Sequence, residues 1–186
     1  MPKLQIAEAE RLRKKGGQLV KDRDSSWLAK WKNMRDYLAP NDGQFDGDQP
    51  NDGERRDRKM VNKRPMRSAQ IAAAGMASGM ASQARPWFNL AAPNGVQKTA
   101  DIDRWLYDVA EAIRLVLSKS NLYNILPQVF HSQAVYGTAA MSALPDDEDI
   151  VRFHHYPVGT FALDTSARGV VDTFYREYTM TPRQMA

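Results

Sequence analysis

The sequence predicts an α+β protein in which helices come first and a small antiparallel β-meander follows. Two observations support this fold class. Apolar residues recur at the spacing of helix faces as far as Gly137, and short runs rich in β-branched and aromatic residues follow it. With 186 residues, the chain is long enough for one domain with a core, or for a domain plus an ordered arm.

The composition excludes several classes of site. The sequence contains no cysteine, which rules out a disulfide framework, a thiolate zinc site and a cysteine nucleophile. Its apolar stretches are far too short to cross a bilayer, and its N-terminus lacks a signal-peptide pattern. We therefore expect a soluble, intracellular protein without a membrane partner.

Residues 1–24 are polar and basic, and their few apolar side chains are too sparse to form a helix face. They predict a basic arm or a marginal helix that needs a partner to become ordered. Residues 25–186 are predicted to form the α+β region itself.

A clear helix is expected to follow the arm and to end before Pro40. Asp24 and Ser25 are predicted to cap its N-terminus. The next segment, residues 40–53, contains four aspartates among turn-forming residues and predicts a long loop. It lacks the ligand order and closing glutamate of an EF-hand, so a calcium site is not expected. The apolar face of the helix consists of Trp27, Trp31, Met34 and Leu38.

Residues 65–84 are almost entirely Ala, Ser, Gly and Met. Pro65 suits the first turn of a helix, and Pro86 is expected to end it. Small side chains one helical turn apart allow another backbone to approach closely, so this helix is predicted to pack tightly within its subunit or against the next. The candidate subunit-packing residues are Ala69, Ala73, Gly75, Met76, Gly79, Met80, Trp87 and Phe88.

Residues 100–118 carry the strongest amphipathic pattern in the chain, with acidic residues at the end that suits the helix dipole. A second helix is predicted to begin at the caps Ser120 and Asn121 and to stop at Gly137. Pro127 is expected to kink it or to break its first turn. The apolar stripe of the first of these helices is Ile102, Leu106, Val109, Ile113 and Val116, widened by Trp105, Ala112 and Leu117.

Beyond Gly137 the pattern predicts four short strands. At the C-terminal end, Thr181-Pro182-Arg183-Gln184 has the pattern of a capping box. We expect this box to begin a further helix, so the sequence is interpreted as part of a longer one. The strands are expected at residues 138–144, 150–156, 159–164 and 170–179.

No constellation typical of catalysis is present. The phosphate-binding G-x-x-x-x-G-K-[ST], the G-x-S-x-G nucleophile turn and the H-E-x-x-H zinc motif are all absent. His154 and His155 are neighbours in a predicted strand and point to opposite faces, so they cannot chelate one metal ion. His131 is interpreted as a packing residue, and Asp146–Asp149 as a solvated turn. We expect no enzymatic activity, no cofactor and no bound metal.

The net charge of +4 is unevenly distributed, because most Lys and Arg residues lie within the first 67 residues. Such a basic region indicates contact with DNA or with an acidic protein surface, although mixed charges are also typical of a solvated helix face. Charge alone does not decide between these possibilities. The candidate contact residues are Arg55, Arg56, Arg58, Lys59, Lys63 and Arg64.

Several motifs occur in an order that resembles the head-to-tail connecting, or portal, proteins of short-tailed bacteriophages. The similarity extends from about Trp27 to the end of the sequence. Gln83 departs from it, since a proline is expected before Arg85, and this departure predicts a helix that runs slightly further here. The motifs are Tyr37-Leu38-Ala39-Pro40, Ile71–Met80, Arg85-Pro86-Trp87-Phe88, Trp105-Leu106, Ser120-Asn121-Leu122-Tyr123, Tyr136-Gly137-Thr138-Ala139-Ala140, Pro157-Val158-Gly159-Thr160 and Gly169–Tyr178.

The resemblance implies a structural role. Members of this family form a homo-oligomeric ring, usually of twelve subunits, at one vertex of the virion capsid, and they are assembled in the cytoplasm of the bacterial host. The implied partners are the major capsid and scaffolding proteins, the packaging motor (terminase), tail adaptor proteins and double-stranded DNA passing through the channel. This chain would supply a wing-like, N-terminal part of a subunit, with its basic residues facing a protein neighbour more readily than DNA.

Three other interpretations stay open. The basic front half with Trp27 and Trp31 is compatible with a stand-alone nucleic-acid-binding module, which would bind DNA as a monomer with a steep salt dependence. A small hydrolase is disfavoured, because no nucleophile–base or metal-ligand spacing is present. A different virion scaffold or connector protein with a similar domain would share the packing features.

Overall fold

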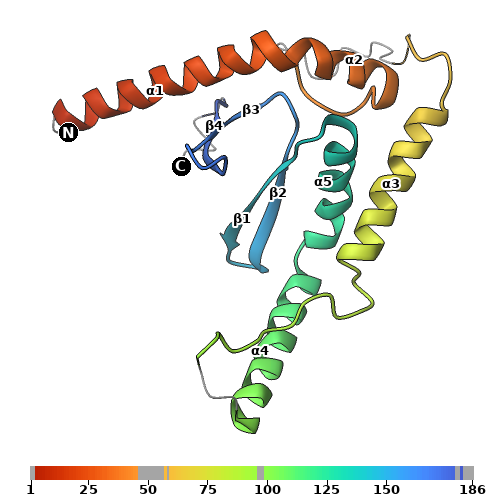
Figure 1. Ribbon diagram of the computed structural model, residues 1–186, viewed down its shortest axis with the longest axis vertical. Helices are drawn as coiled ribbons and strands as arrows, with labels where there is room; N and C mark the ends of the chain where they lie inside the picture. The colour runs from red at the N-terminus through yellow and green to blue at the C-terminus, as the bar shows by residue number, and fades with distance from the viewer. Residues whose placement is uncertain (1–2, 46–56, 58, 96–98, 179–180, 182–186) are drawn as a thin grey trace. The chain divides into compact units, whose positions relative to one another are not determined.

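A computed structural model describes residues 3–45, 57, 59–95, 99–178 and 181. Helices precede strands, which confirms the α+β class. The helices are α1 (Lys3–Arg23), α2 (Ala29–Leu38), α3 (Arg64–Met80), α4 (Ala100–Lys119) and α5 (Leu122–Tyr136), with a π-helical turn, Asp24–Leu28, between α1 and α2. The strands are β1 (Ala140–Asp146), β2 (Ile150–Tyr156), β3 (Phe161–Thr165) and β4 (Val171–Arg176) (Figure 1).

The chain forms two compact units. The first, here called the hairpin unit, comprises residues 1–63 and 156–186 and contains α1, α2, β3 and β4. The second, here called the central unit, comprises residues 64–155 and contains α3, α4, α5, β1 and most of β2. The predicted division of the chain at residue 24 stays a prediction.

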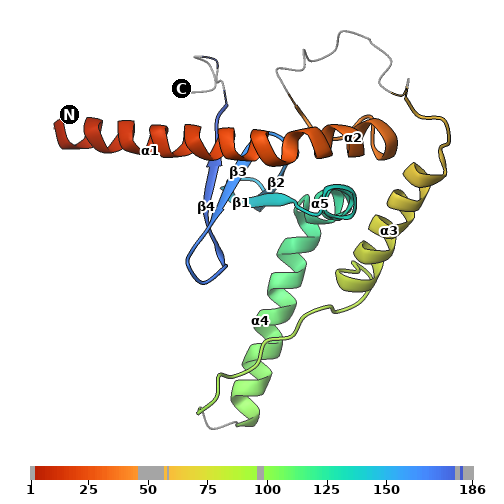
Figure 2. The same cartoon turned by 45° about the horizontal axis from the view of Figure 1, so that its top comes forward.

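In the hairpin unit, α1 continues without a break through the π-helical turn into α2 (Figure 2). The predicted N-cap at Asp24 and Ser25 is wrong, because a capping residue needs an extended backbone whereas the chain stays helical here. Arg23, for example, has φ −58° and ψ −48°. The hydroxyls of Ser25 and Ser26 instead donate hydrogen bonds to the backbone carbonyl of Asp22.

The π-helical turn aligns three residues on one face of this helical run. Gly16 and Arg23 are separated by nearly two full turns, so they share a face. The next packing residue is Trp31, which comes one residue too late after Arg23 to share that face. In a regular α-helix its side chain would point about 80° away from the face of Gly16 and Arg23. The π-helical turn takes up one extra residue and removes this rotation. The run of helix therefore keeps one continuous packing face.

This face packs closely on the β3–β4 hairpin. Gly16 lies directly against the ring of Tyr175, so close that a Cβ atom at this position would overlap the ring. Nη1 of Arg23 donates hydrogen bonds to the backbone carbonyls of Gly159 (2.7 Å) and Phe161 (2.9 Å). Helix and hairpin are thus held by both close contact and hydrogen bonds.

The core of the hairpin unit lies around Phe45 and Val158, which are 2% and 0% exposed. Trp31 packs on Phe45 with 6.4 Å between ring centroids. The backbone N–H of Gln44 donates a hydrogen bond to the Val158 carbonyl at 2.9 Å. Gly159 has φ +102°, and a Cβ atom there would overlap the Gln44 carbonyl and the Phe45 ring. Only glycine fits this position.

In the central unit, α3 packs against α5 and ends at Met80 (Figure 1). The prediction that this helix continues to Pro86 is wrong, and so is the extension inferred from Gln83. The last helical hydrogen bond joins the Ala81 N–H to the carbonyl of Ala77 at 3.1 Å. After α3 the chain turns into the segment that leads to α4 (Figure 1).

Both helices predicted in the second half are confirmed, as α4 and α5. Of the two predicted caps, Ser120 acts as expected: its Oγ accepts a hydrogen bond from the Leu122 N–H at 3.3 Å. Asn121 makes no cap bond. Its side chain pairs instead with the backbone of Phe153 in β2, donating to the carbonyl and accepting from the N–H, both at 2.8 Å. The corner between the helices is thereby fastened to a strand.

The end of α5 follows the prediction at Gly137, which adopts the left-handed conformation (φ 75°) and donates its N–H to the Gln133 carbonyl at 3.0 Å. The helix continues through Pro127 without a break. The expected broken first turn is therefore wrong.

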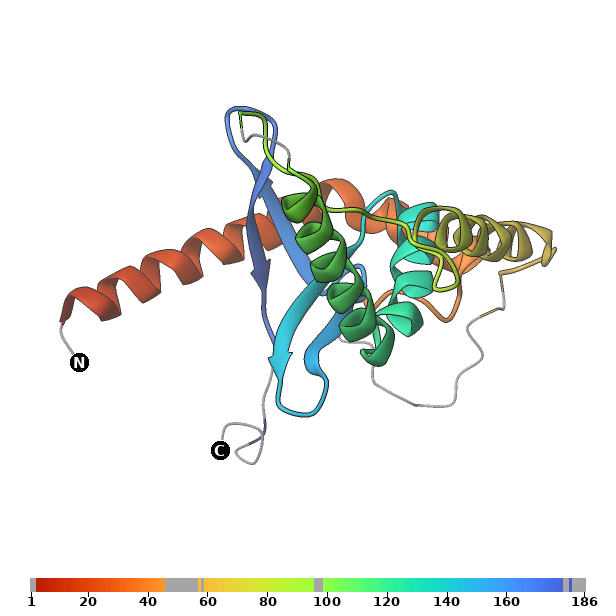
Figure 3. The same ribbon diagram turned by 90° about the horizontal axis from the view of Figure 1, so that it is seen from below.

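Consecutive strands pair in antiparallel fashion, as predicted, within two separate two-stranded sheets, β1 with β2 and β3 with β4 (Figure 3). In the second sheet Leu163 lies opposite Phe174, and the register shifts between Asp164 and Thr165. The meander thus consists of two hairpins. Of the predicted capping box at residues 181–184, only Thr181 lies within the described residues.

Candidate assembly surfaces

Two of the predicted packing residues, Ala69 and Ala73, lie on the side of α3 that packs against α5. Ala73 is 4% exposed and Ala69 is half-buried. Met76 is half-buried on the same side, one turn further along the helix. Small side chains allow the two helix backbones to approach closely. These residues therefore contribute to packing within the central unit.

The opposite side of α3 is open. A Cβ atom added at Gly75 or Gly79 would meet no atom within 4 Å. Ile71, on the same side, is 62% exposed, as is Met80 at the end of the helix. No charged residue occurs from residue 68 to 84, although a solvated helix face normally carries charges. The helix is closely packed on one side only, and the other side offers an uncharged surface made mostly of small side chains.

Trp87 and Phe88 lie in the segment after α3, here called the strap (residues 81–95), which runs along α4 (Figure 3). Their rings meet edge to face with 4.9 Å between centroids, and Trp87 Nε1 donates a hydrogen bond to the Tyr123 hydroxyl at 3.1 Å. Nη1 of Arg114 donates to the Phe88 carbonyl at 3.0 Å, and its guanidinium lies over the Phe88 ring. The same guanidinium forms an ion pair with Glu111. These contacts fasten the strap to α4 and α5.

The strap and α4 enclose one side of an open cavity of about 310 Å³. Arg114 and Glu111, which line it, are already paired with each other. Its lining residues are Gln83, Ala84, Arg85, Pro86, Glu111, Arg114, Leu115, Ser118 and Tyr123.

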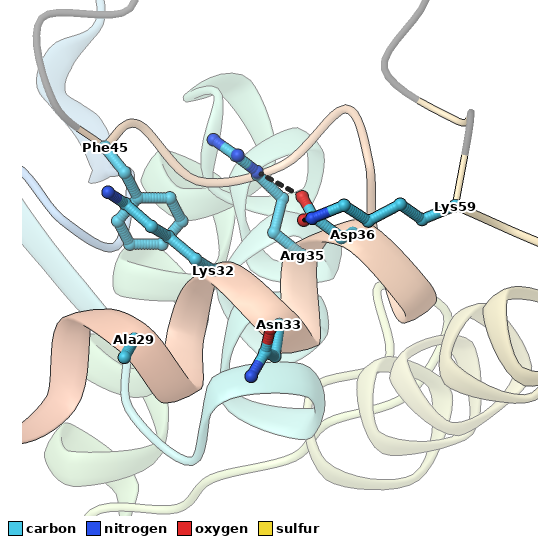
Figure 4. Close-up of a pocket in the computed structure, with 7 residues that line it drawn as sticks. All are labelled: Ala29, Lys32, Asn33, Arg35, Asp36, Phe45 and Lys59. Carbon is cyan, nitrogen blue, oxygen red and sulfur yellow. Dashed lines mark hydrogen bonds and ion pairs between the residues drawn. The ribbon is translucent and has the colours of Figure 1, made fainter.

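Among the predicted basic contact residues, Lys59 has a defined partner in the hairpin unit. Its Nζ lies 2.7 Å from Oδ2 of Asp36, and Nε of Arg35 lies 3.2 Å from the other oxygen of that carboxylate (Figure 4). Arg35 also stacks over the Phe45 ring at 5.4 Å. These residues line an open cavity of about 390 Å³ together with Lys32 and others. Three cations and one carboxylate give this cavity a positive charge.

The pKa values of this ion pair follow from its geometry. Burial opposes the charged form of the Asp36 carboxyl, but hydrogen bonds from Lys59 and Arg35 and their positive charges outweigh it, so the pKa of Asp36 is lowered. The hydrogen bond to Asp36 likewise raises the pKa of Lys59. Both groups are therefore held in their charged forms.

The structure describes only two of the other candidate basic residues. Lys63 and Arg64 are exposed. Arg55, Arg56 and Arg58 lie outside the described residues. The predicted basic patch as a whole stays a prediction.

Aromatic residues form a row along β4 and beside it. Arg176 lies over the Tyr156 ring at 4.6 Å and over the Tyr178 ring at 5.1 Å. Phe174 follows in the same row, 5.5 Å from Tyr156 and 5.6 Å from Phe161 between ring centroids. The sequence predicts such an aromatic side, because alternation along the strand places Phe174, Arg176 and Tyr178 on one face. The row includes residues of β3 and β4 and also Tyr156, which precedes this hairpin in the sequence.

No group of three or more potential metal ligands occurs in the described part of the chain. Among the histidines, His155 lies 3.1 Å from Oγ of Ser132, which is fully buried, so this contact joins β2 to α5 rather than forming an accessible nucleophile. No described helix is long and apolar enough to cross a membrane.

The chain matches the family of bacteriophage head-to-tail connecting proteins over residues 9–186, and it belongs to that family. It is 37% identical over 179 residues to the portal protein of Salmonella phage epsilon15. It is 35% identical, also over 179 residues, to the probable portal protein of Bordetella phage BPP-1. Each alignment covers 96% of this chain and 32% of the relative, so the chain spans about a third of the length of these relatives.

Proposed function

We propose that this chain forms part of a structural, non-enzymatic subunit of a phage portal, a ring of identical subunits at one vertex of the capsid. The observation that carries the proposal is the similarity to two portal proteins along almost the whole chain. Residues 25–186 would form a wing-like part of the subunit, and the basic residues 1–24, most of which form α1, would precede it. The ring would be a component of the virion, assembled in the cytoplasm of the bacterial host.

In this role the ring would form the channel through which the genome is packaged and ejected. It would also provide the docking site for the packaging motor and for the tail adaptor proteins, and it would contact the major capsid and scaffolding proteins. The chain would contribute surfaces to this assembly and no chemistry of its own.

The open side of α3 supports an assembly role. Among the described residues outside the backbone of α3 itself, no atom lies within 4 Å of the Cβ that a leucine at Gly75 would add, and leucine favours a helix more than glycine does. Gly75→Leu should therefore leave the isolated subunit folded but prevent ring formation. The measurement is negative-stain electron microscopy of the complete subunit, together with its mass by light scattering.

The matched control is Gly17→Leu, which changes a glycine of α1 that likewise has room for a Cβ atom. Rings should form at normal yield with this variant. Failure of the unmodified subunit to form rings under any condition would contradict the portal assignment, whereas normal rings with Gly75→Leu would contradict only the role of α3.

A second function, as a stand-alone nucleic-acid-binding module, predicts that monomers bind DNA with an affinity that falls steeply as salt increases. The ion pair between Lys59 and Asp36 argues against it, since this lysine already has a carboxylate partner. We propose instead that the basic residues face an acidic protein neighbour. Tight, salt-sensitive DNA binding by the monomer, weakened by charge reversal at Lys63 and Arg64, would favour the module.

A further inference from the structure

We propose that Asn94, in the strap, is a site of spontaneous chemical modification, at which the side-chain amide is lost and aspartate or isoaspartate forms. The strap leads from α3 to α4 (Figure 1). The reaction needs only water and the backbone N–H of the next residue, Gly95. It goes beyond the proposed function and does not depend on it, because it takes place within one chain.

The residue that follows an asparagine controls how readily this reaction occurs. Its backbone nitrogen must approach the carbonyl carbon of the asparagine side chain, and a Cβ atom on that residue obstructs the approach and restricts backbone rotation. Of all the asparagines in the sequence, Asn94 alone is followed by glycine. The attacking nitrogen and the amide are already close in the chain, so closing a five-membered ring has a low entropic cost.

The conformation at Gly95 shows that the chain uses the freedom of glycine here. Gly95 has φ +98°, which residues with a Cβ atom rarely adopt. Asn94 and Gly95 are both exposed. Apart from the chain neighbours of Gly95, no described atom lies within 4 Å of a Cβ atom added there. Ring closure therefore has the room and the water that it needs.

Hydrogen bonds distinguish Asn94 from asparagines elsewhere in the fold. Among the described residues, neither the Asn94 side chain nor the Gly95 N–H makes one. In contrast, two hydrogen bonds of 2.8 Å hold the Asn121 side chain to the backbone of β2. Asn124 lies within α5, and the N–H that follows it, that of Ile125, donates to a backbone carbonyl at 3.2 Å. Such bonds must break before a ring can close, so the fold protects these two residues and leaves Asn94 unprotected.

The reaction has two steps. The backbone nitrogen of Gly95 gives its proton to water or hydroxide and attacks Cγ of Asn94, the Cγ–Nδ2 bond breaks, and ammonia leaves with a proton from water. Water then opens the resulting succinimide ring. Opening at Cγ gives aspartate, whereas opening at the backbone carbonyl carbon gives isoaspartate, in which the chain continues through the former side chain. Nothing is oxidised or reduced, and water is the sole co-reactant.

Either product changes the strap without removing the contacts that fasten it. One negative charge is added, so the net charge of the chain falls from +4 to +3. Isoaspartate also adds one carbon atom to the backbone path. The strap is fastened upstream of this point, at Trp87 and Phe88. The modified protein should therefore keep its thermal midpoint and appear as a more acidic form in isoelectric focusing.

The test follows the complete subunit during incubation at neutral and mildly alkaline pH, by peptide mapping with mass spectrometry. The peptide that contains Asn94 should gain the mass difference between an amide and an acid, and should take up one oxygen atom from isotopically labelled water. Both aspartate and isoaspartate should form, and the rate should rise with pH because the attacking nitrogen must lose its proton. Asn89, in the same strap but followed by Leu90, is the internal control and should react about tenfold more slowly or less.

Two variants and one change of conditions separate the chemistry from the effect of the fold. Asn94→Gln keeps the amide but needs a larger ring, so its peptide should stay unmodified over the same time. The matched control, Asn89→Gln, should leave the reaction at Asn94 unchanged. In urea, Asn94 should react at a rate within a few fold of that in the folded protein, whereas Asn121 should react faster once its hydrogen bonds are broken.

Three results would overturn the inference. The first is an Asn94 that stays unmodified or reacts no faster than Asn89. The second is modification that appears in urea alone, because contacts of the folded chain would then protect this turn. The third is a product with aspartate but no isoaspartate, since direct hydrolysis of the amide would then account for the loss. The portal assignment is unaffected by these results, because ring formation tests it separately.

Discussion

Glycines in the two units of this protein are used in opposite ways. In the hairpin unit, Gly16 and Gly159 are in such close contact with neighbouring atoms that no Cβ atom fits at either position. In the central unit, a Cβ atom added at Gly75 or Gly79 would have no neighbour within 4 Å among the described residues outside its own helix backbone. The first pair allows parts of one chain to approach each other, whereas the second pair leaves a surface open to another molecule. The same residue type thus serves internal packing in one unit and, we propose, assembly in the other.

The largest expected effect is at Gly159. Gly159→Ala would place a Cβ atom on the Gln44 carbonyl and force alanine into the left-handed region, so we expect a loss of about 3 kcal/mol in the free energy of unfolding. Thermal denaturation followed by circular dichroism measures it. Gly169→Ala is the matched control, because it has φ +73° but open space, and should cost only about 1 kcal/mol. Equal losses at the two positions would contradict the close contact.

A smaller effect is expected at the contact between α1 and the hairpin. Gly16→Leu must displace the Tyr175 ring, which should destabilise the hairpin unit by about 2 kcal/mol. Gly17→Leu, at the next position and in open space, should be neutral or stabilising by a few tenths of a kcal/mol to about 0.8 kcal/mol. Urea denaturation of both variants compares them directly. A normal midpoint for Gly16→Leu would show that α1 does not rest on β4.

The strap offers a test within the central unit. Arg114→Met removes the hydrogen bond to the Phe88 carbonyl and the contact with the Phe88 ring, and should cost about 1–2 kcal/mol. Faster proteolysis within residues 81–95 should accompany this loss. Arg104→Met, which changes an exposed arginine on the same helix, should alter stability by less than about 0.5 kcal/mol. Unchanged proteolysis of Arg114→Met would mean that other contacts hold the strap.

The smallest effect is the pH dependence caused by Asp36. Because its pKa is lowered in the folded protein, the stabilisation is complete above the unfolded pKa of about 3.9 and is lost as the pH falls through the lower, folded value. Partial solvent screening keeps this contribution small compared with the other predicted effects. Asp36→Asn should flatten the acid limb of the stability curve between pH 5 and about 3. An identical acid limb in both proteins would contradict the role of this ion pair.

The sequence predicts the elements of this fold better than it predicts their ends. Helix α4 and the stop of α5 at Gly137 follow directly from apolar spacing and the left-handed preference of glycine. The end of α3 at Met80 does not, because nothing in an Ala-, Ser- and Gly-rich run marks where the chain must turn. The cap predicted at Asp24 fails for a similar reason. The same residue types occur at caps and within π-helical turns, so the sequence does not distinguish them. The extra residue of the π-helical turn is needed only because Gly16 and Trp31 must pack on the same side of the helix.

The candidate surfaces show the same limit. Small-residue spacing correctly indicates that α3 is suited to close packing, but it does not say that Ala73 faces α5 while Gly75 faces solvent. Trp105 is predicted to widen the apolar stripe of its helix, and such a stripe is normally covered, yet Trp105 is 63% exposed. Lys59 is predicted as part of a basic patch, and its ion pair with Asp36 joins residues that are far apart in the chain.

By itself, the sequence determines the α+β class, the lack of cysteine chemistry and the order of motifs that marks the family, because these depend on local spacing and residue identity. Only the tertiary structure decides which side of each helix is covered, which glycines are enclosed and which charges are paired. These properties depend on contacts between residues distant in sequence, and local patterns carry no information about them. The open side of α3 and the exposure of Trp105 on α4 belong to this second group.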